Sequence, residues 1–433
     1  MALTKAIKVG GIIGLGVSGL AVARRLKEAG VDFIAFEAGD GPGGLWRYGC
    51  EAGNVYRSAH LISSRQATEF EDFPMPEDYP AFPSHWQVKA YMEAFAETFA
   101  LAPHYRYNTR VVSVSGRPGN WQVTLAGGET HSFAHVIIAN GHHRDPVRPA
   151  LPGEDRFAGV VIHSSQYRDG AQLDDKRVLI IGSGNSGCDI AVDSAFHARS
   201  TEWSVRTGNY FVPKFVGGAP HDATRKSKAG RIAGLLPPAL RAWLKMRVLR
   251  LIIGTPEQYG LPRPAHRIDE RPPVVNSNVL YHIGHGDVRV RPPLERLDGA
   301  DAVYTDGSRS PADLVILATG YKVSVPFLDE GVLAWEGGSP RLRLNIFPHD
   351  YNGLLFAGLI ELSGGAWRVR DVQARLIARY LAAKLDDPQR VSWFEAMDPE
   401  ANPAATPDPT GQQEIYVDVK RYTPYVNALI ARF

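Results

Sequence analysis

The fold is decided by two stretches of the chain, Ile12-Ile-Gly14-Leu-Gly16-Val-Ser-Gly19 and Ile180-Ile-Gly182-Ser-Gly184-Asn-Ser-Gly187. Each carries the pattern GxGxxG between a run of apolar residues and a run with helical periodicity. In this pattern the first glycine permits a tight turn, the second lets the backbone approach a pyrophosphate, and the third lets helix and strand pack closely. The helix N-terminus adds partial positive charge. Each stretch therefore predicts a dinucleotide-binding unit.

In the first copy, residues 6–13 predict a buried strand and residues 17–29 an amphipathic helix. The next predicted strand, residues 32–36, ends in Glu37, about 20 residues beyond the glycines. A carboxylate at this position accepts hydrogen bonds from ribose hydroxyls. We therefore expect the first site to bind a dinucleotide without a 2′-phosphate. An apolar run at residues 135–139 closes the copy.

In the second copy, a strand at residues 177–181 and a helix to about residue 196 frame the glycines. The following strand delivers Arg206 and Thr207 to the ribose position in place of an acid. A cation at this position suits a 2′-phosphate, so the second site favours NADPH. The alternative interpretation of Arg206 is a solvent-exposed cation at the end of a strand, with no ligand. Residues 313–321 close this copy as residues 135–141 close the first.

Composition narrows the classes of protein. The 433 residues are 44% hydrophobic and 22% charged with a formal net charge of +2, which is typical of a globular protein and gives no electrostatic case for nucleic acid. The two cysteines, Cys50 and Cys188, cannot supply a disulfide framework or a four-cysteine zinc site. We expect a cytoplasmic protein with small-molecule partners, no metal and no membrane association. A homodimer is left open.

A further motif carries a family resemblance. Phe157-Ala-Gly159-Val-Val-Ile-His163-Ser-Ser-Gln-Tyr167 resembles the FxGxxxHxxx(Y/F) signature of the flavin-containing monooxygenases, which are class B flavoprotein monooxygenases. The resemblance spans about residues 5–385 and points to a soluble bacterial-type member. The other matching stretches are Gly43-Gly-Leu-Trp-Arg47, Asp72-Phe-Pro-Met-Pro76, Ala318-Thr-Gly-Tyr321, Phe356-Ala-Gly-Leu-Ile360 and Gln373-Ala-Arg375.

The resemblance implies an α/β fold of two Rossmann-like dinucleotide-binding domains, with the NADPH domain inserted in the FAD domain. We expect residues 1–160 and 311–433 to form the FAD domain and residues 161–310 the NADPH domain. The latter contains a basic insertion at about residues 223–256, where residues 241–253 have amphipathic helical character. Packing of this helix on its own domain is favoured over a membrane-surface patch.

The implied chemistry is that of an oxygenase. In the family, NADPH reduces FAD, O2 adds to give a C4a-hydroperoxyflavin, and a small nucleophilic nitrogen, sulfur or indole-like substrate is oxygenated. Two other oxygenations stay open, a Baeyer-Villiger reaction and decarboxylating oxygenation of an aryl-pyruvate, although Tyr167-Arg168 replaces the Trp-Pro of the Baeyer-Villiger signature. Outside oxygenation, an NADPH oxidase, an electron-transfer flavoprotein or a non-catalytic nucleotide sensor would carry the same motifs.

One departure from the family affects the reacting centre. Ile62 stands where the family has an asparagine near the flavin, so Ser63 or Ser64 is left to supply the hydrogen bond. We take Ile62 and Ser63 as the catalytic candidates. The residues expected to bind cofactor are Gly14, Gly16, Ser18, Gly19, Glu37, Gly44, Leu45, Trp46, Ser64, Val112, Gly182, Gly184, Asn185, Ser186, Gly187, Arg206, Thr207 and Gln373.

Overall fold

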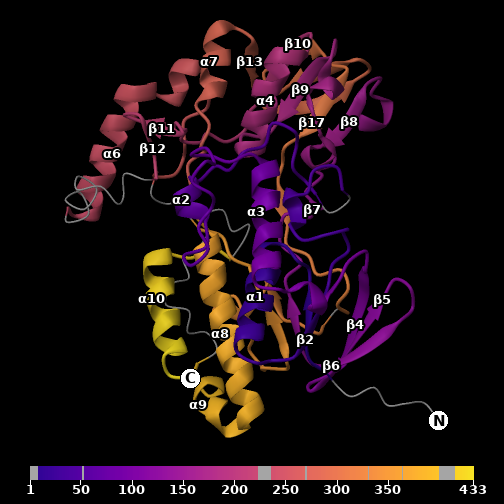
Figure 1. Cartoon of the computed structure of the whole chain (residues 1–433). Coiled ribbons are helices and arrows are strands. Elements are labelled where there is room, and N and C mark those ends of the chain that lie inside the picture. The colour runs from indigo at the N-terminus through magenta and orange to yellow at the C-terminus, as the bar shows by residue number, and fades with distance from the viewer. Residues whose placement is uncertain are drawn as a thin grey trace.

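The computed structural model describes residues 8–50, 53–222, 236–268, 271–329, 331–362, 364–398 and 415–433. Within these ranges the two glycine-containing units build two separate sheets. Figure 1 shows the first unit, with α1 and β2, in the lower half and the second unit, with β8, β9 and β10, in the upper half. The last helix, α10, returns to the lower half. The two ends of the chain thus enclose the second unit in sequence.

The first sheet has the strand order β3-β2-β1-β6-β5-β4, and β23 also pairs with β6. β1 runs parallel to both of its neighbours, β2 and β6, while β5 runs antiparallel to β4 and β6. The strands predicted at residues 6–13, 32–36 and 135–139 are therefore confirmed within the described residues. The strands are β1 Lys8–Ile13, β2 Phe33–Phe36, β3 Tyr105–Arg106, β4 Val111–Arg117, β5 Asn120–Leu125, β6 Thr130–Ile138 and β23 Leu354–Phe356.

The second sheet is parallel throughout, in the order β13-β10-β9-β17-β8. Its strands fall between β6 and β23 in sequence, which is the predicted inserted arrangement. β17 lies beyond the expected boundary at residue 310 yet pairs with β9 and β8, so we propose a boundary after residue 317. The strands are β8 Val160–His163, β9 Arg177–Ile181, β10 Ser200–Ser204, β13 Val288–Arg291 and β17 Leu314–Leu317.

Helices cover the first sheet and form one large apolar core with it, while a second core lies around α4 and α7 of the inserted unit. At the start of the helix at residues 85–98, the Ser84 amide donates to Gln87 Oε1 (3.0 Å), which is the contact of a capping box. The helices are α1 Val17–Glu28, α2 Arg65–Thr68, α3 His85–Thr98, α4 Asn185–His197, α6 Pro238–Ile253, α7 Asn278–His285, α8 Trp367–Asp386, α9 Ser392–Glu395 and α10 Val419–Ile430.

Shorter strands form peripheral ribbons. β7 and β18 pair with each other on the two connections between the units, whereas β11 and β12 pair within the segment between β10 and β13. The remaining strands are β7 Asp145–Pro146, β11 Phe215–Val216, β12 Ala219–Pro220, β14 Leu294–Asp298, β15 Asp301–Tyr304, β16 Arg309–Pro311, β18 Tyr321–Lys322, β19 Trp335–Glu336, β20 Ser339–Pro340, β21 Leu342–Arg343 and β22 Phe347–Pro348.

The basic insertion contains the predicted helix. α6 spans Pro238–Ile253 and begins three residues before the expected start, because prolines are tolerated in a first helical turn. Residues 223–235 of the predicted insertion lie outside the described residues. The expectation that α6 packs its apolar residues on its own domain is right for one side of the helix only, since Trp243, Val248 and Leu251 are exposed. Among the described residues no helix has the length and apolar character that a membrane span requires.

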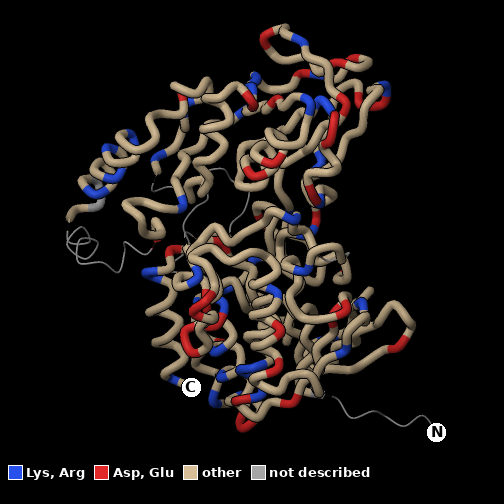
Figure 2. Tube along the Cα trace, turned by 45° about the horizontal axis from the view of Figure 1, so that its top comes forward, with Lys and Arg blue, Asp and Glu red and all other residues tan. Residues whose placement is uncertain are grey.

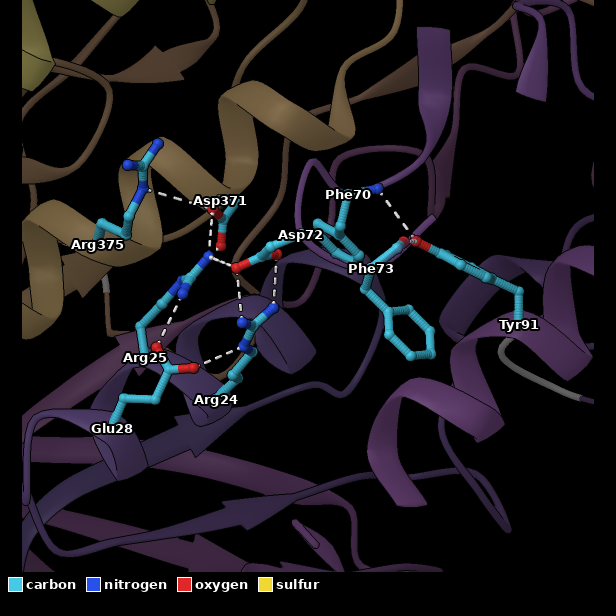
Figure 3. Close-up of polar contacts among 9 residues, drawn as sticks. All are labelled: Arg24, Arg25, Glu28, Phe70, Asp72, Phe73, Tyr91, Asp371 and Arg375. Atoms are coloured by element: carbon cyan, nitrogen blue, oxygen red, sulfur yellow. Dashed lines mark hydrogen bonds and ion pairs between the residues drawn. The ribbon is translucent and has the colours of Figure 1, made fainter. Parts of the chain in front are cut away.

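A network of ion pairs joins α1, α8 and the segment after α2 (Figure 3). Arg24, which is buried, binds both carboxylate oxygens of Asp72 at 2.8 and 2.6 Å. Arg25 donates to both oxygens of Asp371 on α8 at 2.8 and 2.7 Å and reaches Asp72 at 3.1 Å. Such forked, charge-assisted contacts fix geometry as well as sign. The network therefore holds the residue 65–76 segment on the first domain.

Aromatic packing supports the same segment. Tyr91 on α3 accepts from the Phe70 amide at 3.0 Å and donates to the Phe73 carbonyl (Figure 3). Trp367 at the start of α8 lies 5.9 Å from both the Phe70 and Tyr91 rings and is buried. Trp367 is therefore a core residue that packs under this segment.

We predict that Asp72→Asn lowers the melting temperature by several degrees at neutral pH. Burial raises the pKa of Asp72, but hydrogen bonds and charges from Arg24 and Arg25 outweigh it and lower the pKa to about 2. Because the folded-state pKa lies below the ordinary 3.8, the stabilisation is complete above the unfolded value and is lost as the pH falls through about 2. Thermal unfolding from pH 7 downward should show the two proteins converging in acid.

Glu71→Gln is the matched control, because it removes a neighbouring exposed carboxylate that lies outside the network. Its melting temperature should follow that of the wild type at every pH. A constant difference between Asp72→Asn and wild type across the whole range would contradict an electrostatic origin.

Candidate functional site

The first glycine turn leads from β1 into α1. Gly14 has φ +98°, and a Cβ there would lie 2.6 Å from the Ala139 carbonyl oxygen, while a Cβ on Gly19 would lie 1.9 Å from the Gly14 carbonyl oxygen. Neither position accepts a side chain. A Cβ on Gly16, in contrast, would meet only the Gly44 Cα, at 3.8 Å. The turn is closed where strand and helix touch and open at its middle glycine, which is the shape that a pyrophosphate requires.

Glu37 lies directly beyond β2 and beside this turn. Its buried carboxylate accepts from the Leu15 amide at 2.7 Å and from the Gly39 amide at 2.8 Å. The backbone of Thr109 donates to the Glu37 carbonyl at 2.8 Å, which brings the segment before β4 to the same place. Val112 follows three residues later, at a register shift between β4 and β5 that leaves it out of the paired positions. Glu37 and Val112, far apart in sequence, therefore flank one end of the first site.

Gly44, Leu45 and Trp46 form a short 3-10 helix over the turn. A Cβ on Gly44 would come within 3.0 Å of the Gly16 Cα, so the two segments approach closely. Leu45 packs against the core of the second domain, and Trp46 packs against both cores. The predicted pair therefore lies where the two domains meet.

Gln373 on α8 is fully buried, and protein atoms satisfy both ends of its amide. Oε1 accepts from the Gly358 amide at 3.0 Å, and Nε2 donates to the Tyr422 hydroxyl at 3.0 Å. A Cβ on Gly358 would lie 1.9 Å from Ser18 Oγ, so Gly358 approaches the first turn of α1. Gln373 thus holds Gly358 in place beside Ser18, and its expected direct contact with cofactor stays a prediction.

The second glycine turn repeats the geometry of the first. Gly182 has φ +114°, and a Cβ there would lie 2.4 Å from the Ala318 carbonyl oxygen. A Cβ on Gly187 would lie 2.3 Å from the Gly182 carbonyl oxygen, whereas a Cβ on Gly184 would meet no atom within 4 Å. Asn185 and Ser186 open α4, and Asn185 Oδ1 accepts from the Val275 amide at 3.0 Å. The second turn therefore also fits a dinucleotide.

Arg206 and Thr207 are exposed directly beyond β10, next to this turn. Ser183 Oγ donates to the Thr207 carbonyl at 3.0 Å, and Asn209 Nδ2 donates to Ser183 Oγ at 2.8 Å. These bonds hold the residue 206–209 loop against the glycines. The structure thus places Arg206 next to the second glycine turn, and its contact with a ribose 2′-phosphate stays a prediction.

Ile62, Ser63 and Ser64 lie where the chain crosses from one core to the other. Ala59 belongs to the core of the second domain and Leu61 to that of the first. Ile62 is exposed and Ser63 half-buried, whereas Ser64 is buried with no partner for its Oγ among the described residues. The Ser64 amide donates to Asp222 Oδ2 at 2.7 Å. The expected reacting centre thus sits at the domain junction and contacts a carboxylate that sequence reasoning missed.

Two carboxylates on α4 make further cross-domain contacts. Asp189 accepts from the Tyr56 hydroxyl at 2.6 Å and from Asn276 Nδ2 at 2.6 Å, and its burial raises its pKa. Asp193 accepts from Ser58 Oγ at 2.5 Å and from the Tyr167 hydroxyl at 2.9 Å. Spacing of four residues places both carboxylates on one side of α4. That spacing, directly after the second glycine motif, was the available sequence signal for this interface.

The signature histidine has a structural environment. His163 is buried at the end of β8; its Nδ1 accepts from the Ser165 amide at 3.1 Å and its Nε2 donates to the Gly320 carbonyl at 3.1 Å. Burial lowers its pKa, which fits this neutral arrangement. His163 therefore ties β8 to the turn after β17.

A second cluster was not predicted. Nε2 of His142 and of His143 lie 3.7 and 3.4 Å from Glu361 Oε1, just beyond β6 and β23. Burial lowers the pKa of His142 to about 4, so its ring is neutral at pH 7.

Cys188 lies on α4, away from this cluster, and is also buried. Burial raises the pKa of its thiol and leaves it poorly suited to redox chemistry.

Known proteins resemble this chain over most of its length. The family model described as flavin-binding monooxygenase-like matches residues 6–427. Flavin-containing monooxygenase 3 of Macaca mulatta is 32% identical over 389 residues, covering 86% of this chain and 73% of that protein.

Two solved structures have the same fold. The flavin-containing monooxygenase from Stenotrophomonas maltophilia has a TM-score of 0.66 at 22% identity, covering 87% of this chain and 98% of its own. A cyclohexanone monooxygenase mutant from Rhodococcus sp. Phi1 bound to NADP⁺ has a TM-score of 0.72 at 18% identity, covering 99% and 98%. These likenesses confirm the predicted α/β class with two Rossmann-like domains.

We predict that Gly184→Ala and Gly187→Ala separate binding from folding at one turn. Gly187→Ala would place a methyl group against a backbone carbonyl, so this protein should melt several degrees lower or fail to accumulate. Gly184 has φ −76°, which alanine adopts freely, so Gly184→Ala should melt like the wild type. Its methyl group would fill the space left for a pyrophosphate and should weaken NADP⁺ binding at least about tenfold in a titration.

Equal NADP⁺ affinity for Gly184→Ala and wild type would show that the nucleotide does not use this turn. Gly284→Ala on α7 is the matched control, because Gly284 has an ordinary helical backbone and open space around its Cα, so alanine fits there as it does at Gly184. Gly119 also has open space, but its φ of +78° disfavours alanine.

Proposed function

Because the chain belongs to the flavin-binding monooxygenase-like family and is an FAD- and NADPH-dependent monooxygenase, we propose that it oxygenates a small nucleophilic nitrogen or sulfur substrate, or an indole-like one. Two electrons come from NADPH, one atom of O2 enters the substrate, and the other leaves as water. We also propose a cytoplasmic location.

One observation carries the proposal. Two glycine turns of the same geometry lie beside side chains of opposite charge, and one segment of the chain runs between the two domain cores. Glu37 at the first turn suits a ribose with free hydroxyls, as in FAD, and Arg206 at the second suits the 2′-phosphate of NADPH. Residues 62–64 lie between the two cores, where a flavin and a nicotinamide would meet. Bound FAD would supply the oxygen-activating chemistry there.

The chain's own contribution is binding, orientation and exclusion of water. The backbone at Gly16 and Gly184 would face the pyrophosphates, while Glu37 and Arg206 would select the two nucleotides. Packing of Trp46 on both cores and the contacts of Tyr56 and Ser58 with α4 hold the junction together. No strong general acid or base is needed, because the substrate heteroatom is itself the nucleophile.

The experiment that tests the proposal follows the oxygen. Purified holoenzyme would be incubated with NADPH, ¹⁸O2 and separate panels of tertiary amines, thioethers, indoles, ketones and aryl-pyruvates. Incorporation of ¹⁸O at nitrogen, sulfur or the indole ring supports the proposal. An ¹⁸O-labelled ester or a decarboxylated acid instead indicates Baeyer-Villiger or aryl-pyruvate chemistry. Hydrogen peroxide equal to the NADPH consumed, with every panel, indicates an oxidase.

We predict that Arg206→Gln raises KM for NADPH by about tenfold to a hundredfold. Loss of a hydrogen bond to a charged group usually weakens binding by about this factor. KM for NADH should stay nearly constant, because NADH has no 2′-phosphate to lose. Steady-state kinetics with both coenzymes measures the change. Arg289→Gln removes an exposed cation from β13 of the same sheet and serves as the control. Equal effects on both coenzymes would remove Arg206 from phosphate recognition.

We predict that Ser63→Ala increases the hydrogen peroxide released per NADPH oxidised, since Ser63 takes over the hydrogen bond that Ile62 cannot make. Flavin content and the melting temperature should not change, because Ser63 is half-buried at a loop. Ser64→Ala is the companion variant, as its buried Oγ has no protein partner among the described residues. Leakage from that variant alone would transfer the role to Ser64, and unchanged coupling in both would refute it.

A further inference from the structure

α6 presents apolar side chains on two opposite sides. One side holds the helix to its domain: Leu249 is buried, and Met246 and Ile253 pack with it against Val212 and Ile268. The other side has no cover among the described residues. Its exposed fractions are 43% at Leu240, 53% at Trp243, 39% at Leu244, 50% at Val248, 87% at Leu251 and 47% at Ile252.

The exposed residues make a continuous stripe. Leu240, Leu244, Val248 and Leu251 succeed one another at steps of four, four and three residues, which places them in one row along the helix. At 100° per residue this row lies opposite Leu249. We call these four side chains the outer stripe. Contiguous exposed apolar rows of this kind mark a surface that contacts something other than water.

Cations border the outer stripe on both sides. Arg247 and Arg250 lie on one flank and Arg241 and Lys245 on the other, and α6 contains no acidic residue. Figure 2 shows basic positions along this helix without an acidic one among them. The Arg247 guanidinium lies 5.0 Å from the centre of the Trp243 ring, so its stem follows the helix surface.

We propose that α6 docks this enzyme on the surface of an anionic lipid bilayer, with the outer stripe in the interface and the flanking cations at the headgroups. A helix lying in the plane of the interface has this arrangement of apolar row, tryptophan and basic borders. A second copy of the chain fits poorly, because two such helices would face each other with eight cations and no acid. The inference does not depend on the proposed reaction.

Co-sedimentation of the holoenzyme with vesicles tests the docking. Binding is expected to vesicles of phosphatidylcholine mixed with phosphatidylglycerol, to be weak with phosphatidylcholine alone, and to fall at high salt. Leu251→Glu should reduce the partition coefficient at least about tenfold, since it removes the most exposed apolar side chain. Arg241→Gln with Arg247→Gln should reduce it by about fivefold for each cation removed.

Matched controls come from the other domain. Leu385→Glu changes a leucine that is 47% exposed near the end of α8, and Arg421→Gln removes an exposed cation from α10. Both should bind vesicles like the wild type. Flavin content and NADPH oxidation should be unchanged in Leu251→Glu, which shows that it folds.

Three results would overturn the proposal. The first is equal binding to neutral and anionic vesicles, and the second is unchanged binding by Leu251→Glu. The third is a dimer in analytical ultracentrifugation that Leu251→Glu dissociates, because the outer stripe would then be a contact between two copies of the chain.

Discussion

The whole architecture depends on a backbone contact that only glycine permits. At each glycine turn the third glycine lies against the backbone carbonyl of the first. A Cβ added to Gly19 or Gly187 would lie only 1.9 or 2.3 Å from that carbonyl oxygen. This approach lets the helix begin directly beyond the strand and aim its N-terminus past the sheet edge. Without it, neither domain could present a positive helix end to a phosphate. Two identical solutions in one chain bring two dinucleotides into one molecule.

One segment of the chain joins the two cores between the glycine turns. The segment from residue 53 to 64 begins in the core of the second domain, with Val55 and Tyr56, and ends in that of the first. Hydroxyls on it bind carboxylates on α4, and the Ser64 amide binds Asp222. These polar bonds tie the junction at particular points and add to the apolar packing of Leu45 and Trp46 on the core of the second domain. These contacts hold residues 62–64 in place, while each domain keeps a core of its own.

The sequence was sufficient for local structure that neighbouring residues encode. Strand, turn and helix follow one another within about 20 residues, so both turns, Glu37 and Arg206 could be placed from the sequence. Contacts between distant segments could not: Asp222 meets Ser64 across 158 positions, and no local pattern marks that pair. Gln373 shows a subtler limit. Its motif predicts a contact with cofactor, but only the fold shows that its amide is bonded to Gly358 and Tyr422.

α6 shows why periodicity alone misjudged a surface. In a helix with one apolar side, the sequence indicates which side is buried. α6 has two apolar sides, and the sequence does not indicate which of these sides packs on the protein. Burial of Leu249 and Met246 answers that question for one side and leaves Leu251 87% exposed on the other. An isolated exposed leucine needs no explanation, but a row bordered by cations does. Packing on the domain accounts for the inner side, and among the described residues nothing covers the outer side, which is why we assign it to docking.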